Sequence, residues 1–132
     1  MQGLHLTADL RGCNAALHLM VEPAALRAHC LAAVAQAGLK AVGDVFYRFP
    51  APGGVTGVVL LAESHIAVHT WPELGAVTLD VYVCHHQADN SARARHLLAA
   101  MEVAFNPAQV RRHELQRGVA APASSAPQIE AR

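Results

Sequence analysis

Nucleophilic and titratable side chains concentrate in two short stretches of an otherwise apolar region. Residues 63–73 read ESHIAVHTWPE, and residues 80–86 read DVYVCHH. Hydroxyl, thiol, imidazole and carboxylate groups are the side chains that act as nucleophiles and as general acids or bases. The two stretches therefore predict either a catalytic site or a metal site.

A metal site has to be weighed first, because nine histidines and three cysteines are many for a chain of 132 residues. His65 and His69 have the spacing that brings two zinc ligands together on one face of a helix. Their surroundings have the pattern of a strand, however, and four residues along a strand span about 13 Å, too far for one tetrahedral ion. We expect no resident metal, although His69 with Cys84, or His85 with His86 and a third ligand, stays open.

The cysteines allow another reading. Cys84 could act as a nucleophile with His69 as its base, as in cysteine hydrolases. No family-specific signature surrounds Cys84, and a buried structural cysteine is the commoner case. Because Cys13, Cys30 and Cys84 are odd in number and far apart, we expect reduced thiols and no disulfide framework.

The combination of residues is more specific than any one of them. Residues 54–65, GVTGVVLLAESH, followed by HTWPE at 69–73, closely resemble the processing-site segment of the prokaryotic S-adenosylmethionine decarboxylase proenzymes. Leu4-His5 with Asp9, FYRF at 46–49 and DVYVC at 80–84 fall in the family's order and spacing. The resemblance covers about residues 3 to 115.

This resemblance implies that the chain cuts its own backbone between Glu63 and Ser64. The Ser64 hydroxyl would attack the carbonyl carbon of Glu63, and β-elimination of the resulting ester would leave a pyruvoyl group at position 64. In the family, a hydroxyl at the position of Thr56 and the imidazole of His69 assist this cleavage as hydrogen-bonding and proton-transfer partners. The expected products are residues 1–63 and residues 64–132.

The family's reaction also assigns roles in turnover. A pyruvoyl ketone forms a Schiff base with an amine substrate and takes up the electrons released with carbon dioxide. Cys84 matches the acid that returns a proton to the substrate α-carbon, Phe49 a residue that stacks on the adenine, and Glu73 a carboxylate that binds the ribose. We therefore expect a decarboxylase of S-adenosylmethionine that supplies the aminopropyl donor for spermidine synthesis.

Four positions depart from the family's pattern. Thr56 stands where many relatives have serine, and Tyr47 replaces an expected histidine. Val83 and His85 flank Cys84 where threonine and glycine are usual, and a bulky residue in place of glycine can alter a tight turn. Two alternatives therefore stay open: a pyruvoyl-dependent decarboxylase of ornithine or arginine, and an uncleaved, non-catalytic homologue that acts as a partner subunit.

Charge and hydropathy restrict the partners. Ten basic and ten acidic residues leave a formal charge of zero, so the chain lacks the cationic surplus that binds nucleic acid or an anionic membrane. No stretch approaches the roughly 18 consecutive apolar residues of a membrane-spanning helix, and the N-terminus has no basic start followed by an apolar run. We expect a cytoplasmic protein whose ligand is a small molecule.

The elements that must position these residues follow from hydrophobic periodicity. A helix is expected from Pro23 to Gly38, and a second from the N-cap candidates Asp89, Asn90 and Ser91 to before Pro107. The almost wholly apolar run 55–62 is expected to be a central strand buried on both faces. The remaining strands are expected at residues 4–8, 42–49, 65–70, 76–84 and 110–115.

This order of elements predicts an α+β fold, a two-layer α/β sandwich with a mainly antiparallel sheet and helices on one face. Residues 1–117 should form a single domain, and the Ala, Pro and Ser-rich residues 118–132 should be a disordered tail. The sheet face without helices carries valine and leucine, which need a cover. We therefore expect a homodimer of cleaved two-chain protomers.

Overall fold

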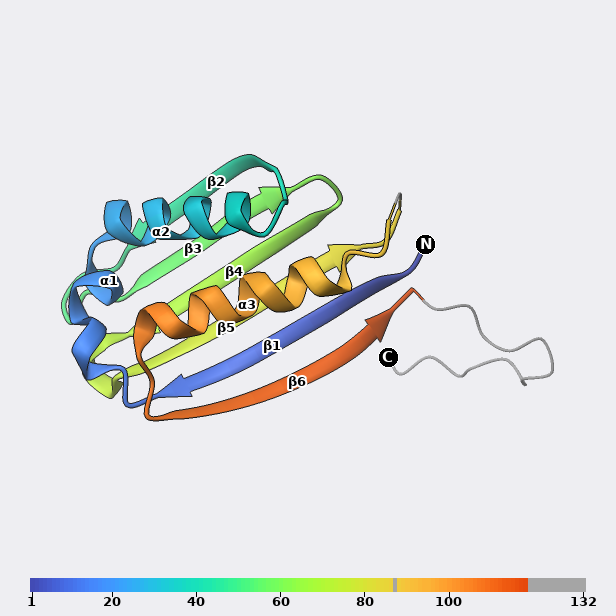
Figure 1. The fold of residues 1–132 in the computed structure, drawn as a ribbon. Helices are drawn as coiled ribbons and strands as arrows, with labels where there is room; N and C mark the ends of the chain where they lie inside the picture. Colours follow the sequence, from blue (N-terminus) through green and yellow to red (C-terminus); the bar gives the residue numbers. More distant parts are fainter. Residues whose placement is uncertain (87, 119–132) are drawn as a thin grey trace, which may run out of the picture.

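The computed structural model describes residues 1–86 and 88–118. The predicted tail therefore lies outside the described residues, except for Gly118. The elements are β1 (Gly3–Arg11), α1 (Leu17–Val21), α2 (Pro23–Gln36), β2 (Ala41–Arg48), β3 (Val55–Leu61), β4 (Ser64–Trp71), β5 (Ala76–Cys84), α3 (Ser91–Phe105) and β6 (Gln109–Arg117), with short 3₁₀ turns at Asn14–Ala16 and Pro72–Leu74 (Figure 1).

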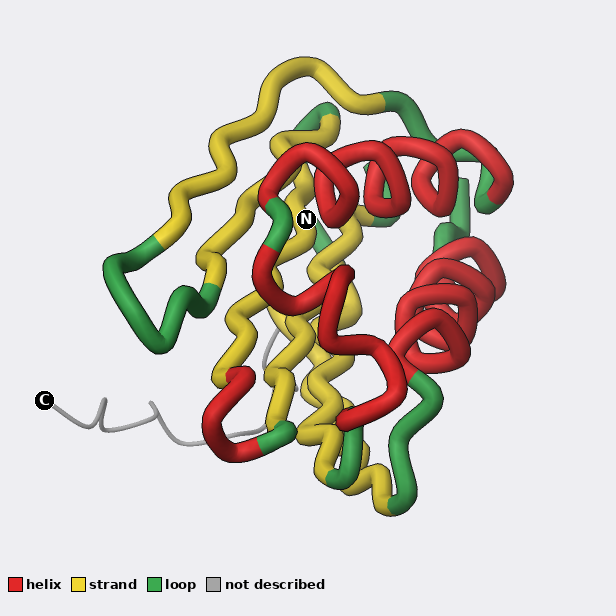
Figure 2. The backbone as a smooth tube through the Cα atoms, turned by 90° about the vertical axis from the view of Figure 1, so that its left-hand side faces the viewer, coloured by secondary structure: helices red, strands yellow, loops and turns green. Residues whose placement is uncertain are grey.

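The six strands form one sheet in the order β2-β3-β4-β5-β1-β6, and every neighbouring pair is antiparallel. The helices lie together on one face of this sheet (Figures 1 and 2). The predicted α+β sandwich is thereby confirmed. None of the helices in the described part of the chain is long and apolar enough to cross a membrane.

The core lies between the sheet and the helices. In β1 the buried residues Leu4, Leu6, Ala8 and Leu10 alternate with more exposed ones, as the period of a strand requires. α3 covers β1 and β5, and α2 covers β2 and β3. The buried stripes of the two helices include Leu26, Cys30, Val34, Leu97, Met101 and Phe105. Full burial of one such leucine or phenylalanine stabilises the fold by about 1.5–3 kcal/mol, which makes this interface the main source of stability.

The prediction that β3 is buried on both faces was wrong for the single chain. Its helix-facing side chains, such as Val59, are buried, whereas Leu60 on the opposite face is 50% exposed. The reason is that both long helices pack on the same side of the sheet. The opposite face, here called the open face, has no helix on it among the residues that the structure describes.

The open face differs between its two halves. Over β2 and β3 it carries Val45, Tyr47 and Leu60, which are 69%, 56% and 50% exposed. Over β5 and β1 it carries polar residues, among them Asp80 and Asp9. Only the first half is an apolar surface of the kind that binds another protein.

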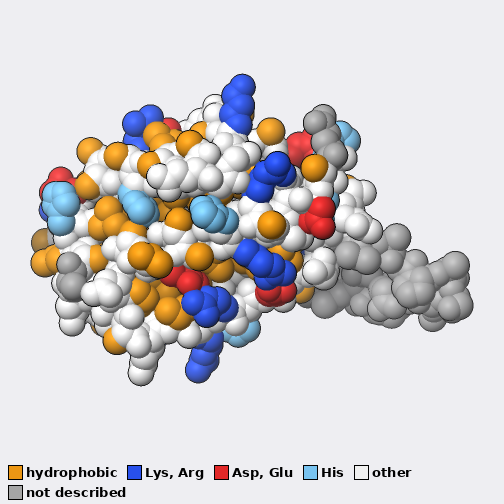
Figure 3. All heavy atoms as spheres, in the orientation of Figure 1, with side chains coloured by type: hydrophobic (Ala, Val, Ile, Leu, Met, Phe, Trp, Pro, Cys, Tyr) orange, Lys and Arg blue, Asp and Glu red, His pale blue; other side chains and the backbone are white. Residues whose placement is uncertain are grey.

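Charged side chains on the helix-covered face mostly occur beside opposite charges (Figure 3). Arg112 donates two hydrogen bonds to the buried Glu102, at 2.8 and 2.7 Å, which ties β6 to α3. Arg95 on α3 pairs with Glu114 on β6 and lowers the pKa of that carboxyl by hydrogen bonding. This face offers no continuous basic field for a polyanion.

Candidate active site

The Glu63–Ser64 peptide lies in the tight turn between β3 and β4. Leu61 pairs with Ser64, so the hairpin loop consists of Ala62 and Glu63 alone. Glu63 has φ of 57°, in the left-handed region, where a residue with a side chain costs roughly 1–2 kcal/mol. The Glu63–Ser64 peptide, where cleavage is predicted, therefore directly follows the strained backbone of Glu63.

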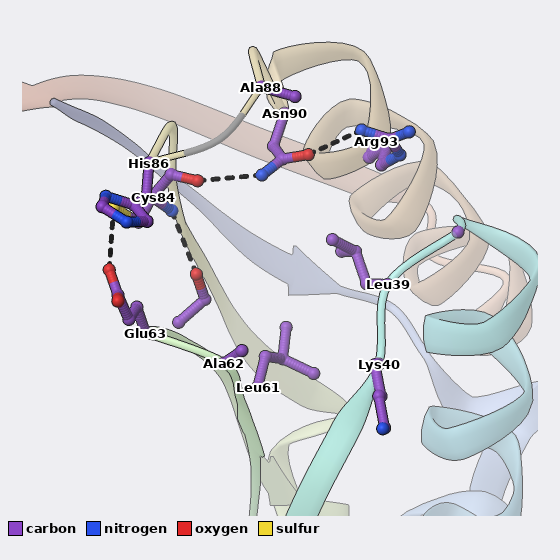
Figure 4. A pocket seen from close by; sticks show the side chains of 12 residues that line it. Leu39, Lys40, Leu61, Ala62, Glu63, Cys84, His86, Ala88, Asn90 and Arg93 are labelled. Carbon is purple, nitrogen blue, oxygen red and sulfur yellow. Dashed lines mark hydrogen bonds between the residues drawn. The ribbon is translucent and has the colours of Figure 1, made fainter.

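Ser64 meets Cys84 across the end of the sheet. The Cys84 N–H donates a hydrogen bond of 3.0 Å to Ser64 Oγ, although the two residues are twenty positions apart in sequence. The Cys84 thiol in turn donates to Glu63 Oε1 at 3.6 Å, and Figure 4 shows these two side chains facing each other. Three residues predicted for cleavage and proton donation thus lie within one hydrogen-bonded group.

This group lines a cavity of about 350 Å³, here called the serine cavity. Its volume falls in the range of small-molecule sites. Lys40 and Leu39 lie across the cavity from Glu63 (Figure 4). The lining residues come from the turn after α2, the β3–β4 hairpin, the end of β5 and the start of α3: Gly38, Leu39, Lys40, Leu61, Ala62, Glu63, Ser64, Cys84, His86, Ala88, Asn90 and Arg93.

The other predicted site residues form a second group at the opposite end of β4. Thr56 Oγ1 and His69 Nδ1 lie 3.0 Å apart on the open face. They line a cavity of about 330 Å³, here called the histidine cavity, together with Phe49 and Glu73. Phe49 is 49% exposed, so its ring is accessible and not packed in the core. An exposed aromatic ring beside a carboxylate is suited to a ligand with a flat ring and hydroxyl groups.

The two cavities are far apart within one chain. Ser64 and His69 are five residues apart along β4, which corresponds to about 17 Å. The fold therefore brings Ser64, Glu63 and Cys84 together, and separately Thr56, His69, Phe49 and Glu73. Within one copy of the chain, His69 and Thr56 do not reach the Glu63–Ser64 peptide.

The same separation removes two alternatives for a single chain. His69 pairs with Thr78 on β5, and Cys84 is six residues beyond Thr78, or about 20 Å along the strand. One chain therefore cannot form a Cys84–His69 catalytic pair, nor can it bind a metal ion with both residues, so these two interpretations were wrong for a single chain. Among the residues that the structure describes, no three histidine, cysteine or acidic side chains converge as metal ligands.

The three cysteines differ in environment. All three are free, but Cys13 and Cys30 are fully inaccessible in the core. Burial raises the pKa of the Cys13 thiol, and burial together with nearby Asp44 raises the pKa of Cys30 to about 12. Because the thiolate is the reactive form, these two cysteines are inert, and Cys84 is the one that faces a cavity.

Comparison with known proteins identifies the family of this chain. The family model of S-adenosylmethionine decarboxylase matches residues 4–118. The chain belongs to the S-adenosylmethionine decarboxylase family. The matched residues include those that line both cavities, the helices α1 to α3 and the strands β2 to β6.

Individual members of the family are similar over almost their whole length. The S-adenosylmethionine decarboxylase proenzyme of Aquifex aeolicus is 39% identical over 117 residues, which are 89% of this chain and 82% of that protein. The proenzyme of Archaeoglobus fulgidus is 38% identical over 116 residues, 88% of this chain and 97% of that protein. The crystal structure of the adenosylmethionine decarboxylase from Aquifex aeolicus matches with a TM-score of 0.80 and 35% identity, over 94% of this chain and 97% of that one.

Two departures from the pattern of S-adenosylmethionine decarboxylases have clear positions in the fold. His85 continues the strand end, because its N–H donates to Gln2 O at 2.8 Å and its Nδ1 accepts the N–H of Asn90 at 3.0 Å. Tyr47 lies on the open face with its ring centroid 4.9 Å from that of Phe49. The bulky His85 is therefore accommodated, and Tyr47 extends the aromatic surface beside the histidine cavity.

Two residues at these sites were not predicted from the sequence as functional. Trp71 lines the histidine cavity, with its ring 6.0 Å from the His69 ring. Asn90 was expected only as an N-cap, but its side chain makes no capping bond and donates instead to Cys84 O at 2.8 Å. Trp71 could have been found from its place in the HTWPE segment, whereas nothing in the sequence signals the contact of Asn90.

Proposed function

We propose that this chain is a self-cleaving, pyruvoyl-dependent S-adenosylmethionine decarboxylase that supplies the aminopropyl donor for spermidine synthesis in the cytoplasm. One observation carries the proposal: in a chain of this family, Ser64 Oγ is hydrogen-bonded to Cys84 beside the strained Glu63, at the wall of a cavity. A nucleophile, the peptide it must attack and an acid thus share one site.

Cleavage begins at the Ser64 hydroxyl. Oγ attacks the carbonyl carbon of Glu63, the C–N bond breaks, and the serine nitrogen takes up a proton as the ester forms. Loss of a Ser64 α-proton then expels the Glu63 carboxylate, and addition of water with release of ammonia yields the pyruvoyl carbonyl. The left-handed backbone at Glu63 favours the first step, because breaking the peptide releases its strain.

The residues of the serine cavity fit a pyruvoyl group at position 64. Ser64 opens a strand whose pairing with β3 and β5 continues through His65, so the downstream chain stays anchored after the cut. The pyruvoyl ketone supplies an electron sink for the bond to the departing carboxylate. The Cys84 thiol, on the same cavity wall, is the group that delivers a proton to the substrate α-carbon.

The roles of Thr56 and His69 require a second copy of the chain, and we include a homodimer in the proposal. A two-fold dimer through the open face would cover the exposed Val45 and Leu60. It could also bring the histidine cavity of one copy to the serine cavity of the other. His69, hydrogen-bonded to Thr56, would then serve proton transfer at the partner's Ser64, and Phe49 and Glu73 would bind adenine and ribose there.

The histidine cavity also favours S-adenosylmethionine over ornithine or arginine. Phe49 and Trp71 offer aromatic surface, and Glu73 offers a hydrogen-bond acceptor for hydroxyl groups, in one cavity. Ornithine and arginine contain neither a flat ring base nor a ribose. A decarboxylase for those amino acids would have no use for this arrangement.

Mass spectrometry of the intact purified protein, with and without a carbonyl-trapping hydrazine, tests the proposal. We expect two chains separated after Glu63, with the hydrazine attached only to the downstream one, and release of carbon dioxide from S-adenosylmethionine but not from ornithine or arginine. A single chain of full mass that releases no carbon dioxide would support the uncleaved partner subunit instead.

A further inference from the structure

The start of α3 contacts the end of β5 through a side chain with no role in the proposed chemistry. We propose that Asn90 is a positioning residue, which holds Cys84 in place for proton transfer through the backbone carbonyl of Cys84. This inference rests on the proposed function, because it concerns the acid of that reaction.

The end of β5 explains why Cys84 needs such a contact. The pairing of β4 with β5 reaches only as far as His65 with Tyr82, so Cys84 has no backbone partner on the β4 side. Its N–H donates instead to the Ser64 side chain at 3.0 Å, and its carbonyl accepts from Asn90 Nδ2 at 2.8 Å. In the uncleaved chain both polar backbone groups of Cys84 are thus held by side chains, and only the bond from Asn90 remains once cleavage removes Ser64 Oγ.

The orientation of the Asn90 amide is determined by its other contact. Arg93 Nη1 donates to Asn90 Oδ1 at 2.7 Å, and Figure 4 shows Asn90 between Cys84 and Arg93. A guanidinium can only donate and a backbone carbonyl can only accept. The amide oxygen must therefore face Arg93 and the amide nitrogen must face Cys84.

The backbone N–H of Asn90 adds a second link, because it donates to His85 Nδ1 at 3.0 Å. Residues 84 and 85 are therefore connected to the first turn of α3 through both the side chain and the main chain of Asn90. A displacement of about 1 Å at a reacting group can cost 100-fold in rate. Even a small displacement of Cys84 is thus expected to lower the rate of decarboxylation measurably.

Two substitutions separate the donor of Asn90 from its other properties. Asn90→Asp keeps the shape and the acceptor for Arg93 but places an oxygen against the Cys84 carbonyl. Asn90→Ala removes the donor without adding a charge. Asp89→Asn is the matched control, because exposed Asp89 accepts the Ser91 N–H at 2.9 Å and an amide oxygen can accept the same bond.

The first readout is the rate at which iodoacetamide alkylates Cys84 in the folded proteins, followed by mass spectrometry. We expect alkylation at least 5-fold faster in both Asn90 variants and unchanged in Asp89→Asn. Cys13 and Cys30, which are fully buried, are internal references and should stay unlabelled. Circular dichroism and melting curves establish that each variant is folded. If Cys13 or Cys30 is labelled in a variant, the faster alkylation results from loosening of the whole fold, and the inference is overturned.

The second readout is the stereochemistry of protonation during decarboxylation in D₂O. A positioned thiol delivers deuterium to one face of the α-carbon, so the wild-type product should have one configuration. Both Asn90 variants should lower kcat about 10- to 100-fold and give a mixture of the two configurations. A protein that is merely less stable would lose rate but keep the single configuration.

The outcomes separate this inference from the proposed function. If both Asn90 variants match the wild type in alkylation and in deuterium configuration, the positioning role is wrong, while cleavage and turnover by the wild type still support the decarboxylase. If instead the wild type stays one chain and releases no carbon dioxide, the proposed function fails, and the alkylation rates alone decide whether Asn90 holds Cys84.

Discussion

The serine cavity and the histidine cavity are of similar volume, about 350 and 330 Å³, but they differ in what they contain. The serine cavity holds a nucleophile, a thiol and a strained peptide that contact one another within one chain. The histidine cavity holds an imidazole–hydroxyl pair and exposed aromatic rings on the open face. In the proposed function, the first forms and breaks covalent bonds, and the second binds a ligand and moves protons.

This difference indicates how a chain of 132 residues could build a two-part active site. One antiparallel sheet presents the two groups at opposite ends of the same strand, β4. Joining them would require only that two copies meet through the open face. Four experiments test this division, from the largest expected effect to the smallest.

Ser64→Ala and Cys84→Ala should separate the two functions inside the serine cavity. Ser64→Ala lacks the attacking hydroxyl, so we expect one uncleaved chain and complete loss of decarboxylation. Cys84→Ala keeps the backbone N–H that contacts Ser64 Oγ, so we expect two chains with turnover reduced by a factor on the order of 10²–10⁴. Intact mass and carbon dioxide release are the measurements, and full activity of Ser64→Ala would refute the origin of the cofactor.

Mixing defective chains tests whether the two cavities cooperate between copies. If the proposed dimer forms, His69→Ala and Cys84→Ala should each be nearly inactive alone, and co-expressed chains should form mixed dimers in which one composite site is intact. With random pairing, about a quarter of the wild-type activity should return. Differently tagged chains allow the mixed dimer to be purified and assayed. Absence of any recovery, in a mixed dimer that does form, would mean that both groups act within one chain.

Thr70→Val should destabilise the histidine cavity by removing hydrogen bonds that hold its wall. Thr70 is buried, its hydroxyl donates to Met20 O at 2.6 Å, and it accepts the N–H of Val55 at 2.8 Å. Valine has the same shape but leaves the Val55 N–H and the Met20 carbonyl without that partner, at a cost of about 1–3 kcal/mol. Urea denaturation measures the loss.

The effect of Thr70→Val on function should be local. Thr70 lines the histidine cavity and its neighbour on β4 is His69, so we expect a higher KM for S-adenosylmethionine and normal alkylation of Cys84. If Thr70→Val instead makes Cys84 more reactive and leaves KM unchanged, its effect is not confined to the histidine cavity.

Glu63→Gly should change the serine cavity by the smallest amount. Glycine adopts the left-handed backbone at position 63 without strain, so we expect a gain of about 1 kcal/mol over Glu63→Ala, the control that removes the same carboxylate. Both are compared in the uncleavable Ser64→Ala background by urea denaturation. In the cleavable chain, Glu63→Gly should be cut more slowly than Glu63→Ala, and equal rates would show that strain plays no part in cleavage.

Local apolar patterns were enough to predict all six strands. Residues 4–8 and 76–84 alternate with the period of two that one buried face imposes, whereas 55–62 is an almost unbroken apolar run. Pro23 and Pro107 similarly bounded the two long helices. The prediction for β3 failed because an apolar strand does not reveal whether its second face is covered by the same chain or left open. The sequence around Leu60 is compatible with either case, and only the position of the helices shows that this side chain is exposed.

The candidate site divides in the same way. The residue types and their order in 54–73 and 80–84 led to the prediction of which groups carry out the chemistry, since the family's motif depends on local sequence, and these roles stay predictions. Only the tertiary structure decided which of them meet: the β5 register places Cys84 on Ser64, and five residues of β4 keep His69 about 17 Å away. The contact of Asn90 with Cys84, six residues apart in sequence, likewise arises because α3 begins beside the end of β5, an arrangement that no sequence pattern indicates.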